Sequence, residues 1–404
     1  MIKVKDIMTK TSYRFTPDDD IFRVIEMFYE LNLEGGLVFR NDELDGLFTE
    51  KDLIKGVALK KKKLKDIYQK VEIAREKLQI GPISIQVYQE NNNPDINARI
   101  AIHQDDAIIL FSGSIIEQLS DEELLSVIGY ELAHIQLWKA ENSEMEIVDR
   151  IISSIGNSFN LYDTYDETAR RFNLYKEIYC DLGAYTVTND IAPVITALVK
   201  CSTGLKNVSA ESYLRQIKDI LDKDPELKSE GLTHPENYVR AYALEQKSIL
   251  GDQFQLPEKL IAGTSTIDNL DVFDQQIKHK QTLELLNYIM QAKWMQTDLF
   301  LSHVKLFNPE FKVKETDEIE IENYKNAHTS IKDYLSYLLL DFILLDFNNE
   351  ELARGWIFQV ADNLGVDAEL KNIVKKELKL SDKQFKNLYH ESVKTLQKIQ
   401  TKSA

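Results

Sequence analysis

The chain has 404 residues, which is too long for one small hydrophobic core, so we expect two or three domains. Hydrophobic residues make up 43% of it and charged residues 28%, an ordinary globular composition that argues against long disordered segments. The formal net charge of -17 disfavours nucleic acid as a partner, because binding to phosphates needs a clustered positive field. The basic run at residues 60–63 is a local exception, which we interpret as a solvated linker or helix face rather than an anion site.

The cysteine count and the apolar segments indicate where the protein resides. The chain has two cysteines, Cys180 and Cys201, so no disulfide framework is implied and a reducing compartment is expected. The first residues contain no apolar stretch of the signal-peptide type. The most apolar segment, 334–347, is interrupted by Asp341 and is too short to span a bilayer. We therefore expect a cytoplasmic protein without a membrane partner.

The first segment, residues 1–62, has the pattern of a small α/β unit. Apolar residues between positions 21 and 31 recur at helical spacing, and two glycines end that pattern. Short apolar runs at 37–39 and 47–48 flank a turn and predict two strands, and residues 50–59 predict a second helix.

This segment resembles a CBS motif in the runs Val-Lys-Asp-Ile-Met-Thr at 4–9 and Gly-Leu-Phe-Thr-Glu-Lys-Asp at 46–52. The resemblance implies that Thr49 and Asp52 contact the ribose of an adenine nucleotide, and a hydroxyl and a carboxylate can both bond sugar hydroxyls. The alternative is that both residues cap the following helix. CBS motifs normally work in pairs and the chain has one convincing copy, so we expect pairing between two chains in a homodimer.

The second segment, residues 66–250, carries the chemistry. It begins with a helix and continues with three predicted strands at 83–88, 98–103 and 107–111. Ser120 with Glu123 then forms a predicted capping box. The helix that follows is apolar on nearly every side, which is typical of a helix inside a domain. Glu131 and His134 on this helix therefore need an explanation.

That helix contains the pattern Tyr130-Glu131-x-x-His134. A zinc peptidase helix carries two histidines at i and i+4, because this spacing directs both imidazoles toward one ion. The glutamate beside the first histidine takes a proton from the metal-bound water. Here a tyrosine takes the place of the first histidine.

Further residues strengthen the pattern downstream. Glu177 and Asp181 lie one helical turn apart, which suits a carboxylate ligand and an acid that orients a ligand. His234 precedes a proline and is followed by Arg240. Taken singly, His134 is as readily explained as a core histidine, and Glu177 and Asp181 as solvated positions on a helix. His234 and its proline are as readily explained as the end of a loop. Their joint order favours a common site.

Together these motifs resemble the HtpX and CAAX-prenyl-protease family of gluzincin metallopeptidases. The resemblance implies an α+β fold, with a mainly helical peptidase domain and a small sheet. The family's site residues carry over as follows: His134 and Glu177 as zinc ligands, Tyr130 at the place of the first ligand, Glu131 as general base, Asp181 as a support for a ligand, His234 near the substrate carbonyl and Arg240 bracing that region.

The third segment, residues 251–404, is predicted to be an all-α domain. Apolar runs at 334–345 and 352–364 indicate a pair of helices. The acidic run between them is similar to the helix–loop of TerB-like domains, over about residues 325–400, although Phe347 stands where those domains have a glycine. The alternative for the acidic run is a solvated turn with helix caps.

Two functions remain open at this point, and the motifs favour the first. The first is a zinc-dependent endopeptidase that acts on a peptide or protein substrate. The second is a pseudopeptidase that binds polypeptide, or senses a nucleotide, without cleavage. Tyr130 motivates the second, unless it is an inactivating change introduced into the natural sequence. In either case the CBS-like unit suggests regulation by an adenine nucleotide.

Overall fold

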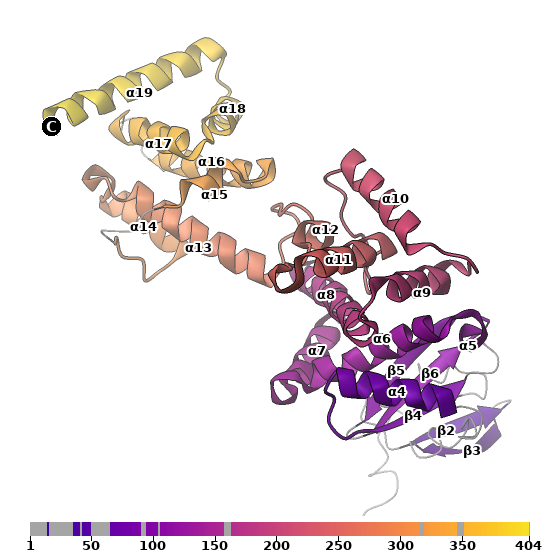
Figure 1. The fold of residues 1–404 in the computed structure, drawn as a ribbon. Coiled ribbons are helices and arrows are strands. Elements are labelled where there is room, and N and C mark those ends of the chain that lie inside the picture. Colours follow the sequence, from indigo (N-terminus) through magenta and orange to yellow (C-terminus); the bar gives the residue numbers. More distant parts are fainter. Residues whose placement is uncertain are drawn as a thin grey trace, which may run out of the picture. The chain divides into compact units, whose positions relative to one another are not determined.

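The structure is a computed structural model that describes residues 14–15, 35–40, 43–49, 65–89, 94–103, 106–156, 163–314, 319–345 and 351–403 (Figure 1). Its described residues group into two compact units. The first comprises Met1–Glu146, Lys176–Ile220 and Arg240–Gln255, and the second comprises Ile147–Tyr175, Leu221–Val239 and Leu256–Ala404. The expected boundaries at 62, 66 and 250 stay a prediction.

Three strands are described in the CBS-like segment: β1 (Arg14–Phe15), β2 (Gly35–Arg40) and β3 (Glu43–Thr49). β1 pairs with β2 in parallel, and β2 pairs with β3 as an antiparallel hairpin. The two predicted strands of this segment are thus confirmed. The two predicted helices, Asp52 and the basic run at 60–63 lie outside the described residues.

A second three-stranded sheet lies in the peptidase-like segment, and it confirms the three strands predicted there. It consists of β4 (Ser84–Gln89), β5 (Asn97–His103) and β6 (Asp106–Ser112) in the order β4-β6-β5. β6 is parallel to β4 and antiparallel to β5. β6 is the central strand, and its apolar side chains Ile109 and Phe111 are fully buried.

Helices cover this sheet and complete the first unit. α4 (Lys65–Lys77) packs against α6 (Asp121–Lys139), and α6 also contacts β5 (Figure 1). The helices that follow α6 in this unit, in whole or in part, are α8 (Asp163–Thr188), α9 (Ile191–Thr203), α10 (Ala210–Lys223) and α11 (Asn237–Leu250). The short α5 (Ile115–Gln118) and the 3-10 segments η2 (Ala140–Ser143) and η3 (Gly251–Gln253) lie between the longer elements.

The start of α6 is fixed by the predicted capping box. The Ser120 side chain accepts from the backbone N–H of Glu123, and the Glu123 carboxylate accepts from the backbone N–H of Ser120. The same carboxylate pairs with Lys200 of α9 at 2.7 Å. Burial by itself raises the pKa of Glu123, but the bonds from Lys200 and Ser120 outweigh burial and lower it.

α6 and α8 approach each other closely through small residues. A Cβ atom added at Gly183 of α8 would lie 2.4 Å from the Cβ of Ala133 on α6. One added at Gly129 of α6 would lie 3.0 Å from the Cβ of Val187 on α8. This close approach brings α8 side chains against the helix that carries Tyr130, Glu131 and His134.

The second unit is helical, and its core is separate from that of the first. Its helices include α7 (Glu144–Gly156), α12 (Glu258–Ala262), α13 (Val272–Ile289), α14 (Asp298–Phe307), α15 (Ile321–Lys325), α16 (Thr329–Leu345), α17 (Glu351–Leu364), α18 (Asp367–Glu377) and α19 (Asp382–Ser403), with the 3-10 segment η4 (Lys293–Met295). α16 and α17 are the predicted apolar pair, and they pack against each other. The acidic run at 346–350 lies outside the described residues, so the TerB-like resemblance stays a prediction.

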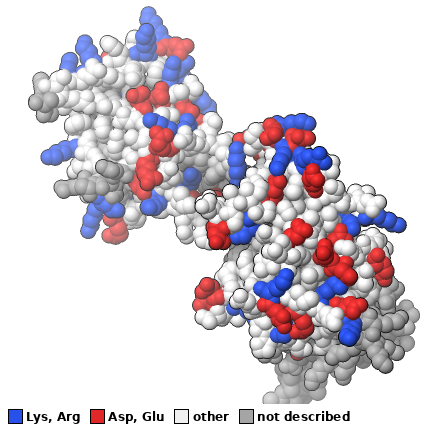
Figure 2. All heavy atoms as spheres, viewed as in Figure 1, with Lys and Arg blue, Asp and Glu red and all other residues white. Residues whose placement is uncertain are grey.

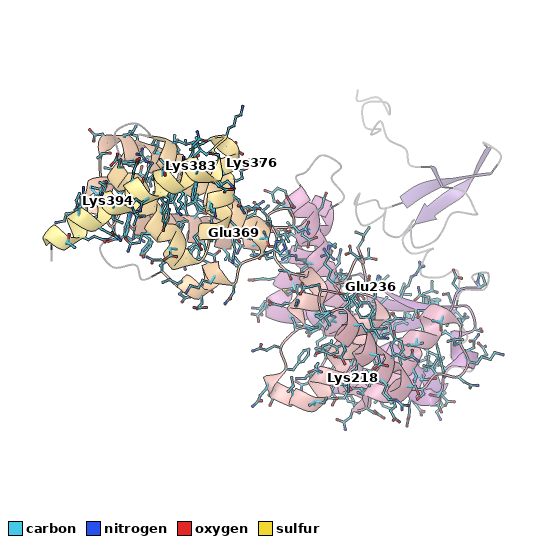
Figure 3. The ribbon with its side chains drawn as sticks, turned by 90° about the horizontal axis from the view of Figure 1, so that it is seen from above. Lys218, Glu236, Glu369, Lys376, Lys383 and Lys394 are labelled. Carbon is cyan, nitrogen blue, oxygen red and sulfur yellow. The ribbon has the colours of Figure 1, made fainter. Side chains whose placement is uncertain are left out.

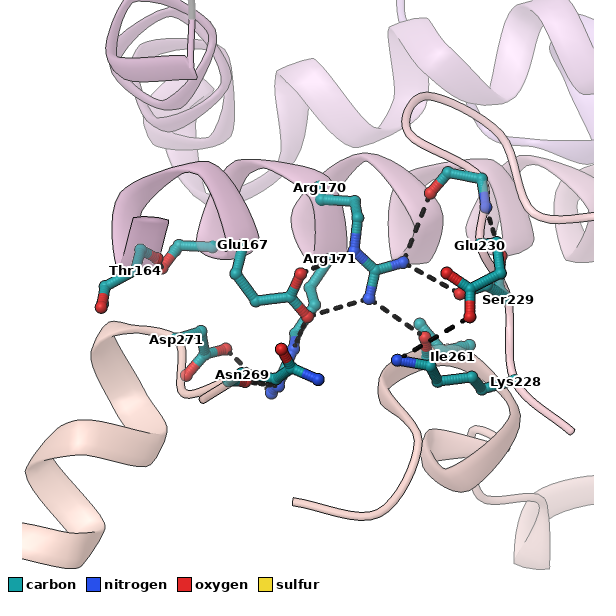
Figure 4. Close-up of polar contacts among 12 residues, drawn as sticks. Thr164, Glu167, Arg170, Arg171, Lys228, Ser229, Glu230, Ile261, Asn269 and Asp271 are labelled. Carbon is teal, nitrogen blue, oxygen red and sulfur yellow. Dashed lines mark hydrogen bonds and ion pairs between the residues drawn. The ribbon is translucent and has the colours of Figure 1, made fainter. Parts of the chain in front are cut away.

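A polar network fixes the first half of α8 within the second unit (Figure 4). Arg170 forms a two-pronged bond with Glu167 at 2.7 and 2.8 Å and also donates to the carbonyl of Ser229. Arg171 contacts Asp274 at 2.7 Å and donates to the carbonyl of Asn269. Two paired guanidinium groups thus fasten α8 to the segments around 229 and 269.

Charged side chains of both signs are interspersed over both units on the face that Figure 2 shows. Some of them bond to a neighbouring helix: Lys218 of α10 lies 2.8 Å from Glu245 of α11, and Lys376 of α18 donates to the Tyr337 hydroxyl of α16. Figure 3 labels both lysines. Within the described part of the chain, no helix has the length and apolar character that a bilayer crossing requires. The α+β class, with a mainly helical domain around a small sheet and a helical C-terminal region, is confirmed.

Candidate active site

The structure brings six of the candidate side chains together in the first unit. Tyr130, Glu131 and His134 lie on α6, Glu177 and Asp181 lie on α8, and Arg240 lies on α11. Glu131, Glu177, Asp181 and Arg240 are all buried, with between 2% and 8% of their surface exposed. Buried charges of this kind are rare unless they are paired, so their partners define what the site can do.

Tyr130 bonds directly to one of the expected ligands. Its hydroxyl donates a hydrogen bond to the carboxylate oxygen Oε2 of Glu177. Its ring also meets the ring of His134 edge to face, with 5.3 Å between the ring centroids. Burial raises the pKa of the Tyr130 phenol well above its ordinary value, and the nearby Glu177 carboxylate adds to the rise. Tyr130 is therefore a neutral phenol in contact with both expected ligands.

Arg240 connects Asp181 to the same tyrosine. Its Nε and Nη2 donate to the two carboxylate oxygens of Asp181, each at 2.7 Å. Its guanidinium carbon lies 5.0 Å from the centroid of the Tyr130 ring, within the range of a cation–π contact. Asp181 was expected to orient a ligand, and in the structure it forms this two-pronged ion pair with Arg240.

Glu131 lies in an environment that favours its protonated form. Burial raises the pKa of Glu131 to about 8, and the Glu177 carboxylate raises it as well, against the opposing charges of Arg240 and Arg99. The side chain is 4% exposed. At neutral pH most of this group is a carboxylic acid, which can donate a proton but cannot accept one as a base does.

Three candidates remain, His234, Thr49 and Asp52. His234 belongs to the second unit, its side chain is exposed, and its Nδ1 lies 3.0 Å from the Thr233 hydroxyl. Thr49 is the last residue of β3 and its side chain is not described, while Asp52 lies outside the described residues. The roles expected of these three residues stay predictions.

Comparison with protein families identifies two parts of the chain. Residues 4–59 match the CBS domain, and residues 58–248 match peptidase family M48. Residues 58–248 are a peptidase family M48 domain. This domain contains α6, the cluster around Tyr130 and the first part of α11, and it confirms the resemblance to metallopeptidases of this type. A search of curated proteins finds no match.

The donor atoms of the M48 domain do not fit a zinc ion. A zinc peptidase site supplies three protein ligands from histidine and carboxylate side chains. Among the residues that the structure describes, no three side chains of histidine, cysteine, aspartate or glutamate form such a group. Tyr130 offers a phenol in place of an imidazole, and in the metal-free site burial raises the pKa of this phenol, so it stands there as a weak neutral donor.

Two contacts of this site could not be found from the sequence. The bond from Tyr130 to Glu177 joins residues 47 positions apart, and helical spacing does not tell which side chains meet across two helices. The positive charge of Arg99 on β5 lowers the pKa of Glu131, and nothing in the alternating pattern of that strand distinguishes Arg99 from a solvated arginine.

Cys180 adjoins the cluster, and burial raises the pKa of its thiol well above the ordinary value, as in an unreactive core cysteine.

Proposed function

We propose that the M48 domain of this chain is a pseudopeptidase, which binds polypeptide in an extended conformation and does not cleave it. The observation that carries the proposal is the hydrogen bond from Tyr130 to Glu177. Through this bond the tyrosine occupies a carboxylate that a metallopeptidase would offer to its metal ion. The second expected ligand, His134, lies against the same tyrosine ring.

The charges around the tyrosine support the same function. A hydrolytic water needs a base beside it, and burial in the metal-free site raises the pKa of Glu131, which disfavours the carboxylate form of that base. Loss of one of three ligands weakens zinc binding more than loss of a supporting partner, which itself lowers affinity about 10–100-fold. The chain thus retains residues of the peptidase motif without the donors that make the motif catalytic.

The edge of the sheet supports polypeptide as the ligand. β5 stands at the end of the strand order β4-β6-β5, so one side of its backbone is unpaired within the described sheet. Such an edge can add an extended peptide as a further strand. β5 also contacts α6, and the charge of Arg99 on β5 acts on Glu131 of α6. A peptide paired with β5 would lie beside the former catalytic helix.

Two substitutions of Tyr130 test the proposal with an unfolded protein such as casein as substrate. Tyr130→His supplies the missing imidazole four residues before His134, which is already present. We expect this variant to cleave casein when zinc is added. Tyr130→Phe is the matched control, because it removes the hydroxyl without adding a ligand, and we expect no cleavage. The wild-type chain should bind casein and leave it intact. Cleavage by the wild-type chain that a chelator abolishes would favour a zinc endopeptidase and contradict the proposal.

A second proposal concerns the CBS domain at residues 4–59. We propose that it binds an adenine nucleotide, with Thr49 and Asp52 on the ribose hydroxyls. Two chains would pair through this domain, because the chain has a single copy. Calorimetric titration with AMP, ADP and ATP should give saturable heat that Asp52→Ala reduces. Absence of heat with all three nucleotides would contradict the proposal.

A further inference from the structure

A metal ion held by ligands on two helices also joins those helices, so a domain that has lost its metal needs another connection. We propose that the Tyr130–Glu177 hydrogen bond is this connection, and that it makes the fold of the M48 domain independent of metal. The inference rests on the proposed function, because both require a site without zinc. It adds a role for Tyr130, which joins α6 to α8 as a metal ion would. The tyrosine does not supply the catalytic chemistry of a metal ion.

The bond joins the two elements that a metal ion would join. Tyr130 lies on α6 beside the expected ligand His134, and Glu177 on α8 is the expected ligand of the other helix. A phenol reaches farther from its backbone than an imidazole does. Its hydroxyl can therefore cross the space that an ion would fill between a histidine and Glu177.

Burial makes this bond matter for stability. Glu177 is 4% exposed, so its carboxylate has lost most of its water. A buried polar group is destabilising unless it is hydrogen-bonded. The phenol supplies one donor to the Glu177 carboxylate from the opposite helix.

A third helix holds the tyrosine in this position. Arg240 of α11 lies over the Tyr130 ring and forms its two-pronged ion pair with Asp181, one turn beyond Glu177 on α8. The close packing of Gly183 against Ala133 also keeps α6 and α8 in register. Tyr130 is thus fixed on its ring face by α11 and at its hydroxyl by α8.

Thermal unfolding of the full chain tests the inference. We expect the Tm of the wild type to be the same with and without EDTA. Tyr130→Phe should lower the Tm by about 5 °C, because it removes this hydrogen bond to a buried carboxylate. Glu177→Met combined with Tyr130→Phe should recover most of this loss, because replacing both partners of the bond by apolar groups leaves neither partner behind. Tyr130→His should be destabilised without metal and regain the loss when equimolar zinc is added.

Three outcomes would overturn the inference. They are a wild-type Tm that falls in EDTA, a Tyr130→Phe Tm equal to that of the wild type, and a double variant whose loss is the sum of the losses measured for Tyr130→Phe alone and for Glu177→Met alone. If Tyr130→Phe does not fold, folding of the double variant still supports the inference, and its failure to fold contradicts it. If the wild-type chain cleaves casein and its Tm is the same with and without EDTA, the proposed function is contradicted. The inference that the Tyr130–Glu177 bond joins the two helices would still stand.

Discussion

At position 130 the chain carries a phenol where its family resemblance implies an imidazole, and this single exchange changes the charge balance of the site. A neutral phenol donates to Glu177, and Arg240 neutralises Asp181. Burial raises the pKa of Glu131 and the Glu177 carboxylate adds to the rise, while Arg240 and Arg99 oppose it. The acids of this site therefore lie in different electrostatic environments, because their partners differ.

The raised pKa of Glu131 predicts a pH dependence of stability. The folded chain holds the Glu131 proton up to about pH 8, whereas an unfolded glutamate releases it near its ordinary pKa of 4.5. The stabilising contribution is therefore complete below the unfolded pKa and is lost as the pH rises toward the folded pKa, by up to roughly 1.4 kcal/mol per pH unit. Glu131→Gln should be less sensitive to pH across this window.

Urea unfolding of the wild type and Glu131→Gln, at a mildly acidic pH and near pH 8, measures this dependence. The variant should lose less of its free energy of unfolding between the two conditions than the wild type loses. Equal losses in both proteins would show that Glu131 ionises in the folded chain as easily as in the unfolded one.

The sequence predicted which helices carry these residues, but not how the side chains bond. Helical spacing placed Glu177 and Asp181 on one face, and the structure places both on α8 as buried groups. Their partners come from α6 and α11, and a pattern within one helix holds no information on the register of another. The tyrosine was recognised as the unusual residue, but its bond to Glu177 was not foreseen.

At the scale of elements, α6 and α8 work as a pair because small residues allow close contact. Gly183→Ala adds a methyl group that would meet the Ala133 Cβ at 2.4 Å. Alanine favours a helix over glycine by about 1 kcal/mol, whereas overpacking in a core destabilises by about 1–3 kcal/mol. We expect the clash to prevail, with a net loss of about 1 kcal/mol in the free energy of unfolding.

Gly81→Ala provides the control for this prediction, because no atom lies within 4 Å of the added methyl group. Gly129→Ala is an intermediate case, with Val187 at 3.0 Å. Chemical denaturation should rank the losses with Gly183→Ala first and Gly81→Ala last. A Gly183→Ala chain as stable as Gly81→Ala would contradict the close contact of α6 and α8.

The elements themselves were mostly predictable. Alternating apolar residues gave β4, β5 and β6, and the Ser120–Glu123 pair marked the start of α6, because these signals are local in sequence. The Arg170 and Arg171 network was not predicted (Figure 4). Its partners are backbone carbonyls 59 to 98 positions away, and any residue type can supply a carbonyl.

At the scale of the whole molecule, the residues that the structure describes form two hydrophobic cores that share no residue. One contains Leu339 in the second unit and the other contains Ile128 on α6, and both side chains are fully buried. The order of the segments was predictable from composition and motifs. The grouping of 147–175 and 221–239 with the C-terminal helices was not, because long-range packing determines it.

Separate cores predict separate unfolding steps. Leu339→Ala and Ile128→Ala should each destabilise one core by about 2–5 kcal/mol, the usual effect of removing a buried aliphatic side chain. In scanning calorimetry each variant should shift a different transition and leave the other in place. A single transition that both variants shift equally would indicate one cooperative unit.

The zinc content of the purified wild-type chain tests the central claim most directly. Metal analysis by mass spectrometry, after dialysis against zinc and removal of free ions, gives zinc per chain without reference to any substrate. The tyrosine at position 130 predicts far less than one equivalent in the wild type and in Tyr130→Phe, and about one equivalent in Tyr130→His. One equivalent in the wild type, lost when Glu177 is replaced by Ala, would contradict the claim that Tyr130 closes the site to metal.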